Sequence, residues 1–140
     1  MIGVVLVSHA NIAKEMLDVI EHIVGPQNQI IAISIFPKDD MEKKRHEILD
    51  SVKKVDSGSG VIVLTDMFGG TPSNLAISVM ENEKIEVVAG VNLPMLIKMM
   101  SIRKKKKIKE LIRISQESGR KYINVASAFF GENKDWDKKK

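Results

Sequence analysis

The chain has 140 residues, of which 44% are hydrophobic and 29% are charged. This composition excludes a disordered protein, and the length suits one globular domain with a single core. It has no cysteine, which excludes disulfides, thiol catalysis and cysteine-ligated zinc. The formal net charge is +4, and no apolar stretch approaches the roughly 20 residues of a membrane-spanning helix. Because the N-terminus also lacks the pattern of a signal peptide, we expect a cytoplasmic protein without stable membrane insertion.

The first half of the chain alternates strand and helix patterns. The expected elements are a strand over 2–7, a helix over 11–24, a strand over 30–36 and a helix over 38–55. The first strand is a continuous apolar run, which is typical of a strand buried on both faces. Gly25 and Pro26 stop the first helix, and Asp39 with Glu42 resembles a capping box at the start of the second.

The alternation continues in the second half. The expected elements are a strand over 61–64, a helix over 71–80, a strand over 85–89, helices over 94–100 and 108–117, and a short strand over 122–125. Thr71 is a good N-cap residue, and Pro72 suits the first helical position. Gly119 is expected to end the last helix.

Strands that alternate with helices predict an α/β fold, with an open, mainly parallel sheet and helices on both faces. We expect one domain over residues 1–128, followed by a loose C-terminal tail over 129–140. In such folds ligands bind beyond the carboxyl ends of the strands, so candidate functional residues are sought there.

His9 and Asp66 each follow the carboxyl end of a predicted strand. If the first and third strands are neighbours, the two side chains emerge side by side. A carboxylate that accepts a hydrogen bond from one imidazole nitrogen fixes the tautomer and makes the other nitrogen more basic. That nitrogen then becomes a good nucleophile, so His9 and Asp66 are candidate catalytic residues.

The segment GGTPSN, residues 69–74, opens the third predicted helix beside this pair. Its glycines allow a tight turn, and the first amides of the helix are expected to form an anion site. The candidate phosphate-binding residues are Gly70, Thr71, Ser73 and Asn74. A nucleophilic histidine, an orienting carboxylate and a phosphate cradle together indicate a phosphohistidine.

Plainer interpretations of the same residues stay open. His9 alone could be structural, Asp66 alone could cap a loop, and GGTPSN alone is a good helix start. The segment is not a Walker loop, because no lysine follows the glycines at the required spacing. A protein that binds an anion or a nucleotide without covalent chemistry is therefore a rival hypothesis.

The remaining polar features favour ordinary roles. His22 and His46 lie on amphipathic helices away from the strand ends, and without cysteines they supply no metal cluster, so no metal is expected. Ser8 is not expected to act with His9, because neighbours on an extended chain point to opposite sides. The basic run 103–109 is expected to be a solvated loop and not a nucleic-acid surface, since no aromatic residue interleaves with it.

Four motifs stand out along the chain: GVVLVSHANIA, GVIVLTDMFGGTPSNLA, VVAGVNLPML and SGRKY. Together they resemble the IIA domain of the mannose-type sugar phosphotransferase system, and the resemblance covers residues 1 to about 128. Many α/β proteins contain one such segment, but few contain all four in this order. A stand-alone branch from proteobacteria with incomplete phosphotransferase systems, in which the domain serves regulation, is the most similar variety.

The resemblance implies a phosphocarrier. The phosphorylated histidine of the family matches His9, its aspartate matches Asp66, and its helix-start hydroxyl matches Thr71. Members receive the phosphoryl group from the small carrier protein HPr and pass it to a IIB partner, and no cofactor is needed because the donor is itself a phosphoramidate. The resemblance also implies a homodimer in which the last strand, here 121–125, crosses to the other subunit.

Two departures from the family pattern leave this chemistry untouched. Phe68 stands where transport members often have tryptophan, and Ala10 with Asn11 replaces the common glycine after the histidine. A second client stays open, because a closely related domain donates phosphate to a dihydroxyacetone kinase complex. The sequence names neither the sugar nor the phosphoryl acceptor.

Overall fold

The computed structural model describes residues 1–81, 84–132 and 134–135, and the rest of the chain, residues 82–83, 133 and 136–140, lies outside the description. In chain order the elements are β1 (Gly3–His9), α1 (Ile12–Val24), β2 (Ile30–Ile35), α2 (Met41–Val55), β3 (Val61–Thr65), α3 (Thr71–Ser78), β4 (Ile85–Ala89), α4 (Leu93–Ile102), α5 (Ile108–Lys121) and α6 (Ala126–Phe129).

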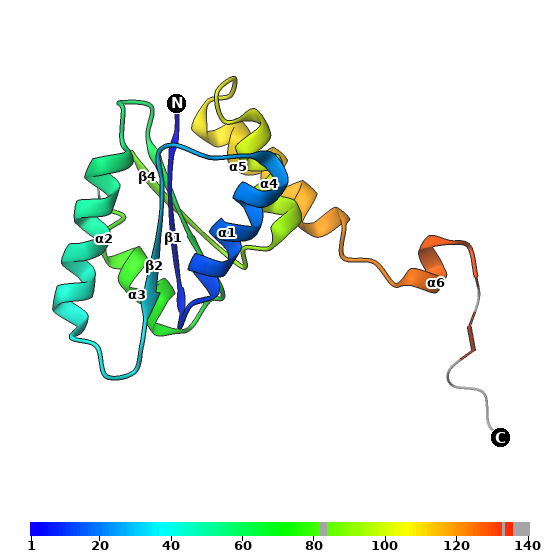
Figure 1. The fold of residues 1–140 in the computed structure, drawn as a ribbon, viewed down its shortest axis with the longest axis horizontal. Helices are drawn as coiled ribbons and strands as arrows, with labels where there is room; N and C mark the ends of the chain where they lie inside the picture. The colour runs from blue at the N-terminus through cyan, green and yellow to red at the C-terminus, as the bar shows by residue number, and fades with distance from the viewer. Residues whose placement is uncertain (82–83, 133, 136–140) are drawn as a thin grey trace.

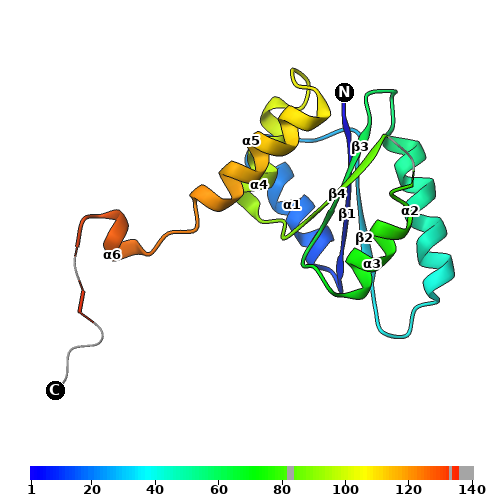
Figure 2. The same cartoon turned by 180° about the vertical axis from the view of Figure 1, so that it is seen from behind.

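The four strands form one sheet in the order β2-β1-β3-β4, and every neighbouring pair is parallel. The helices α1, α4 and α5 cover one face of the sheet, and α2 and α3 cover the other (Figure 1; Figure 2 shows the reverse side). The predicted α/β fold with a parallel sheet is therefore confirmed.

The core lies on both faces of the two central strands. The apolar side chains of β1 and β3 alternate between the cluster under α1, α4 and α5 and the cluster under α2 and α3. Burying one such Val, Leu or Ile side chain contributes about 1.5–3 kcal/mol. This explains why these strands are continuous apolar runs in the sequence.

The predicted end of α5 at Gly119 is wrong, since the helix continues to Lys121. A Cβ atom at Gly119 would lie 3.2 Å from the Cβ of Met95 on α4, and the Gly119 carbonyl accepts a 2.9 Å hydrogen bond from Asn92 Nδ2. The glycine is therefore used for the close approach of two helices and not for a helix stop.

The predicted cap of α2 is also shifted by one residue. Asp40, not Asp39, is the N-cap, and its carboxylate accepts hydrogen bonds from the amides of Glu42 and Lys43. The Asp39 carboxylate instead accepts a 2.7 Å hydrogen bond from the Phe36 amide and closes the loop after β2.

The fifth strand expected over 122–125 does not form. Tyr122, Ile123 and Val125 are 57%, 75% and 67% exposed, and the segment leads away from the body of the protein to α6 (Figure 1). A strand needs a neighbouring strand for its backbone hydrogen bonds, and among the described residues no strand pairs with this segment. Of the expected tail, residues 133 and 136–140 lie outside the described residues.

Candidate functional site

His9 and Asp66 meet at the carboxyl edge of the sheet because β1 and β3 are neighbours. His9 is the last residue of β1, and Asp66 follows Thr65, the last residue of β3. The register pairs Val7 with Thr65, so His9 and Asp66 follow the last paired residues and both lie at the same edge of the sheet. The carboxyl edge is the end of an open α/β sheet where ligands bind.

Two hydrogen bonds hold the pair together, and a third fixes the carboxylate. His9 Nδ1 lies 2.7 Å from Asp66 Oδ2, and the backbone amide of His9 donates to the same oxygen at 2.9 Å. The other oxygen, Oδ1, accepts a 3.0 Å hydrogen bond from the Met67 amide. Because the carboxylate is an acceptor, it selects the tautomer with the proton on Nδ1 and leaves the lone pair on Nε2.

The two side chains differ in exposure. The His9 side chain is 47% exposed, whereas that of Asp66 is 12% exposed. Burial by itself raises the pKa of Asp66, but the hydrogen bonds from the His9 amide and ring, the charge of His9 and the Met67 amide outweigh it and lower the pKa below its usual value. The carboxylate is thus ionised and fixed, and the imidazole presents Nε2 to solvent.

We expect Asp66 to remain mainly ionised at pH 3.8, the ordinary pKa of an aspartate. The pKa of Asp66 is lower in the folded state than in the unfolded state. Its contribution to stability is therefore complete at pH values above the ordinary pKa and is lost as the pH falls through the lowered pKa of the folded state. A ¹³C NMR titration of the Asp66 carboxyl measures the midpoint. In a His9→Ala protein the midpoint should move upward, and a wild-type midpoint at or above 3.8 would contradict the prediction.

Ser8, which was not expected to act with His9, fixes the turn that follows His9. Its hydroxyl is buried, accepts a 2.7 Å hydrogen bond from the Ala13 amide and donates to the Ala10 carbonyl at 3.2 Å. Between them Ala10 adopts a φ of 47°, a left-handed conformation that favours glycine. Ser8 therefore acts as a structural cap for the first turn of α1.

The start of α3 differs from the prediction in its details. Gly70, not Thr71, is the N-cap, and Thr71 is the first helical residue. Ser73 is 0% exposed, and its hydroxyl is used within the loop, where it accepts from the Gly69 amide and donates to the Gly70 carbonyl. The Asn74 amide donates to the Gly70 carbonyl at 3.1 Å. The Asn74 amide is therefore used within the helix, and the Ser73 hydroxyl is used within the loop.

Gly70 and Thr71 remain beside His9. A Cβ atom at Gly70 would lie 2.6 Å from His9 Cε1 and 2.9 Å from Nε2, so the imidazole packs directly against the Gly70 backbone. Thr71 is exposed and lines the same cavity as His9. In the described part of the chain its amide makes no hydrogen bond, which leaves it as a donor at the positive end of α3.

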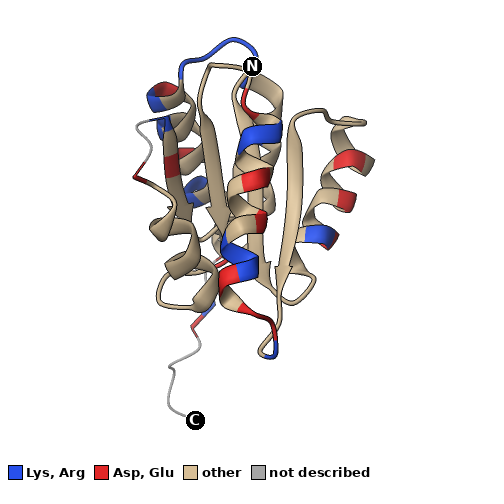
Figure 3. Ribbon diagram, turned by 90° about the vertical axis from the view of Figure 1, so that its left-hand side faces the viewer, with Lys and Arg blue, Asp and Glu red and all other residues tan. Residues whose placement is uncertain are grey.

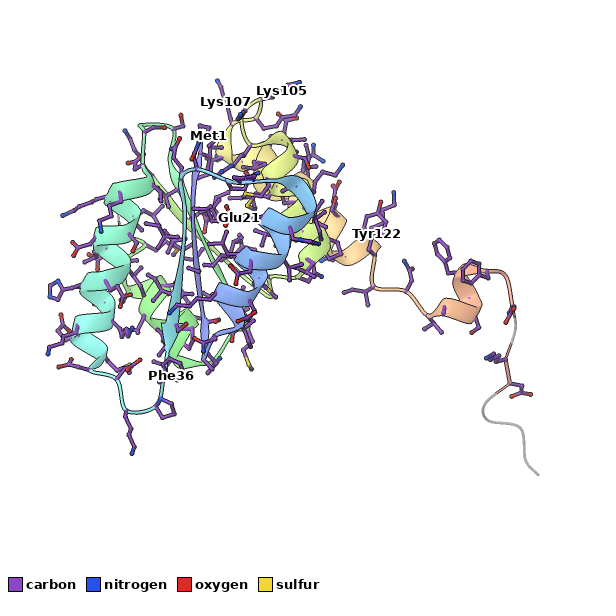
Figure 4. The ribbon with its side chains drawn as sticks, viewed as in Figure 1. Met1, Glu21, Phe36, Lys105, Lys107 and Tyr122 are labelled. Carbon is purple, nitrogen blue, oxygen red and sulfur yellow. The ribbon has the colours of Figure 1, made fainter. Side chains whose placement is uncertain are left out.

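A cavity of about 510 Å³ opens beside His9 on the β2 side. Its lining is mainly apolar: Ala10, Ile35, Phe36, Pro37 and Met41, with His9, Asp39 and Thr71. The Asp39 carboxylate is already held by the Phe36 amide and lies 3.9 Å from Lys44 Nζ. Figure 4 labels Phe36 at this end of the molecule.

On the other side of the pair the loop after Asp66 exposes two large apolar side chains. Met67 is 56% exposed and Phe68 is 68% exposed. His9 therefore lies between two apolar patches, Phe36 with the cavity on one side and Met67 with Phe68 on the other.

The other histidines stay apart from this site. His46 lies 3.6 Å from Glu42 on the exposed surface of α2, and His22 is in the last turn of α1. Among the residues that the structure describes, no group of three His, Asp or Glu side chains is arranged to hold a metal ion. Within the same residues, no helix is both long and apolar enough to cross a membrane.

Fold and site together define a parallel α/β protein with a histidine–aspartate pair at the carboxyl edge of its sheet. The sequence pattern of the family described as "PTS system fructose IIA component" matches residues 3–116. The chain therefore belongs to this family, the IIA components of the fructose and mannose type of sugar phosphotransferase system. The resemblance found in the motifs is confirmed at this level.

Known proteins agree with this assignment. The fructose-specific EIIA component of Bacillus subtilis is 28% identical over 128 residues, 91% of this chain and 88% of that protein. The mannose-specific EIIAB component of Escherichia coli is 31% identical over 91% of this chain, which spans only 40% of that longer protein.

Solved structures show the same fold. The phosphotransferase system component EIIA of Streptococcus agalactiae superposes with a TM-score of 0.83 at 26% identity, covering 91% of this chain and 99% of that one. The IIA protein associated with the fucose utilization operon of Streptococcus pneumoniae gives 0.81 at 28% identity, covering 91% and 96%.

Proposed function

We propose that His9 accepts a phosphoryl group from phosphorylated HPr in the cytoplasm and passes it to a IIB protein or holds it as a regulatory signal. The observation that carries this proposal is the 2.7 Å contact between Nδ1 and Asp66 on an imidazole whose side chain is 47% exposed. A histidine fixed on one nitrogen and open on the other is suited to nucleophilic attack.

In the proposed step the lone pair of His9 Nε2 attacks the phosphorus in line. The P–N bond of the donor breaks as the new P–N bond to Nε2 forms, and the donor histidine leaves with the bonding electron pair. The His9 ring becomes more positive, and the Asp66 carboxylate stabilises it through the proton on Nδ1. No change of redox state and no metal is required.

The transferring oxygens carry negative charge, and the start of α3 offers them a partner. The Thr71 amide and hydroxyl lie at the positive end of this helix, beside the Gly70 backbone that touches the imidazole. In this proposal Gly70 and Thr71 hold the phosphoryl group, whereas Ser73 holds the loop in shape.

Replacing Gly70 with alanine should slow phosphoryl acceptance by about 10- to 100-fold, because the new methyl group displaces the imidazole. The φ of Gly70 is −106°, which alanine adopts freely, so the fold should survive. Phosphorylation rates and the ¹⁵N NMR shifts of the His9 ring measure the two effects. An unchanged ring with an unchanged rate would contradict the proposed packing.

The apolar patches on either side of His9 support a protein as the phosphoryl partner. A free sugar is recognised by hydrogen-bonding groups, but the cavity beside His9 offers apolar walls and a carboxylate that is already bonded. A partner that brings its own reactive side chain to Nε2 must cover Phe36 or Met67.

Changing Phe36 and Met67 together to alanine should raise the KM for phosphorylated HPr about tenfold or more, because both lose contact area in the docked complex. Phosphorylation of His9 by phosphoramidate, a small donor that needs no docking surface, should keep its rate. Phe129→Ala with Phe130→Ala is the control, since these phenylalanines at the end of α6 are also exposed and lie away from His9. Equal losses with both donors would contradict the docking role.

The dimer implied by the family stays part of the proposal. The outer edge of β4 has no neighbouring strand within the described residues, and a cavity of about 360 Å³ runs along Glu86 to Ala89. The extended, exposed segment 122–125 is suited to pair with that edge in a second copy. We keep the division into a domain over 1–128 and a tail over 129–140 as part of the same proposal.

The rival hypotheses have less support. A non-covalent anion or nucleotide sensor needs several free donors at the start of α3, but Ser73 is buried and the Asn74 amide is bonded. No observation favours a dihydroxyacetone kinase complex or the regulatory proteobacterial branch over a transport system. Phosphoryl transfer from HPr to His9, followed by transfer to candidate acceptors, tests the proposal directly.

A further inference from the structure

The connection between α4 and α5, together with the first turn of α5, carries a dense cluster of positive charge. Its exposed lysines are Lys104, Lys105, Lys107 and Lys109, here called the lysine cluster. No Asp or Glu occurs between positions 99 and 109. Lys106 is paired with Glu110 at 3.3 Å, whereas the four lysines of the cluster form no ion pair with any residue that the structure describes.

The cluster lies at the end of the molecule opposite His9. It follows the end of α4 and precedes α5, at the amino edge of the sheet, whereas His9 lies at the carboxyl edge. Figure 4 labels Lys105 and Lys107 at the end that also holds Met1, with Phe36 at the far end. Figure 3 shows the connection as a continuous blue loop at the tip beside the N-terminus.

A buried arginine anchors this loop to the body of the protein. Arg103 is 1% exposed, and its guanidinium donates to the carbonyls of Ile2, Asn28 and Gln29 and to the side chain of Gln27. The backbone that precedes the lysines is therefore fixed on the strand ends. The lysines project from a rigid tip, so their charges stay together.

This arrangement is unfavourable for the chain alone. Lys107 is the N-cap of α5 and makes no capping hydrogen bond, although a helix N-terminus already carries positive partial charge. Lys109 adds a further charge in the first turn of the same helix. An anionic surface opposite the tip removes this repulsion, which is a physical reason for a partner.

We propose that the lysine cluster docks the protein onto an anionic lipid bilayer through electrostatic attraction to the headgroups. Clusters of four or more basic residues bind such surfaces. The affinity increases about tenfold for every one to two lysines added. A flat plane of negative charge fits a projecting tip, whereas nucleic-acid binding would call for aromatic side chains, and residues 98–112 contain none. The contact is peripheral and inserts nothing into the bilayer.

This docking turns the carboxyl edge of the sheet away from the membrane. His9 and the apolar patches beside it then remain open to protein partners. The proposal goes beyond the phosphocarrier function and does not depend on it, because Lys104, Lys105 and Lys107 line neither the cavity beside His9 nor the cavity beside Phe68.

Sedimentation with vesicles tests the proposal on the full chain. Vesicles of phosphatidylcholine containing phosphatidylglycerol should bind the protein, pure phosphatidylcholine vesicles should not, and high salt should release it. A variant with Lys104→Gln, Lys105→Gln and Lys107→Gln should lose about 100-fold in partition coefficient. The charge-matched control carries Lys14→Gln, Lys38→Gln and Lys43→Gln. These lysines are exposed near the carboxyl edge of the sheet, and the control should keep its binding to the anionic vesicles.

Circular dichroism establishes that both variants are folded before they are compared. No binding of the wild type to the anionic vesicles would overturn the proposal. An equal loss in the control variant would also overturn it, because net charge and not the cluster would then be responsible. Binding of a duplex oligonucleotide with no binding to vesicles would assign the cluster to nucleic acid instead.

Discussion

His9→Ala should abolish phosphoryl acceptance from phosphorylated HPr while the protein stays folded. The imidazole is the only side chain at this edge that combines a fixed tautomer with an exposed nitrogen in the described structure. It is half exposed and outside the core, so its removal should change the free energy of unfolding by less than about 1 kcal/mol. Phosphorylation is followed on gels that retard phosphoproteins, and folding by thermal melting.

His22→Ala and His46→Ala are matched controls for this experiment. Both residues are exposed histidines on the helices α1 and α2, away from Asp66. Each control should be phosphorylated as fast as the wild type. Phosphorylation of a folded His9→Ala protein would disprove the assignment of the acceptor.

Asp66→Ala should slow phosphoryl acceptance by about 100-fold without removing it, since the nucleophile remains but its orientation does not. Three hydrogen bonds are lost, from the His9 ring, the His9 amide and the Met67 amide. Without the carboxylate the ring is free to exchange the proton between Nδ1 and Nε2. The rate constant for transfer and the ¹⁵N tautomer signals of His9 report the two effects separately.

Asp66→Asn is the informative companion variant. It keeps the size of the side chain and loses the charge, so the electrostatic stabilisation of the phosphorylated ring is removed while much of the packing is kept. We expect a rate between those of the wild type and Asp66→Ala. Wild-type rates in both variants would show that Asp66 has only a structural role.

Much of the fold could be predicted because the sequence carries it in simple patterns. The apolar runs at Val4–Val7 and Val61–Leu64 are buried on both faces, and only a covered parallel sheet gives such runs. The meeting of His9 with Asp66 follows from the adjacency of β1 and β3 together with the rule that parallel strands end at one edge.

The errors concern local geometry that depends on tertiary contacts. Gly119 looks like a helix stop, but it is the site where α5 approaches Met95 closely. The hydroxyl of Ser73 closes the loop over Gly69 and Gly70, a role that the helix-start pattern does not indicate. The apolar segment 122–125 looks like a strand, but none of the strands in the described part of the chain pairs with it.

Ser8 shows a different limit. Its hydrogen bond spans five residues to the Ala13 amide, a spacing outside the usual capping motifs. The role of Ser8 depends on the left-handed conformation of Ala10. That conformation brings the first turn of α1 back over the end of β1. The positions beside a functional residue are thus the ones that sequence patterns describe least.

Mapping the phosphoryl group on the wild-type protein is the most direct test of the account. The protein is incubated with phosphoenolpyruvate, Enzyme I and HPr, and intact mass is followed by peptide mapping under alkaline conditions, which preserve phosphohistidine. The account predicts one acid-labile phosphoryl group, on the peptide that contains His9. A phosphoryl group on His22 or His46, or none on folded protein while HPr is charged, would contradict it.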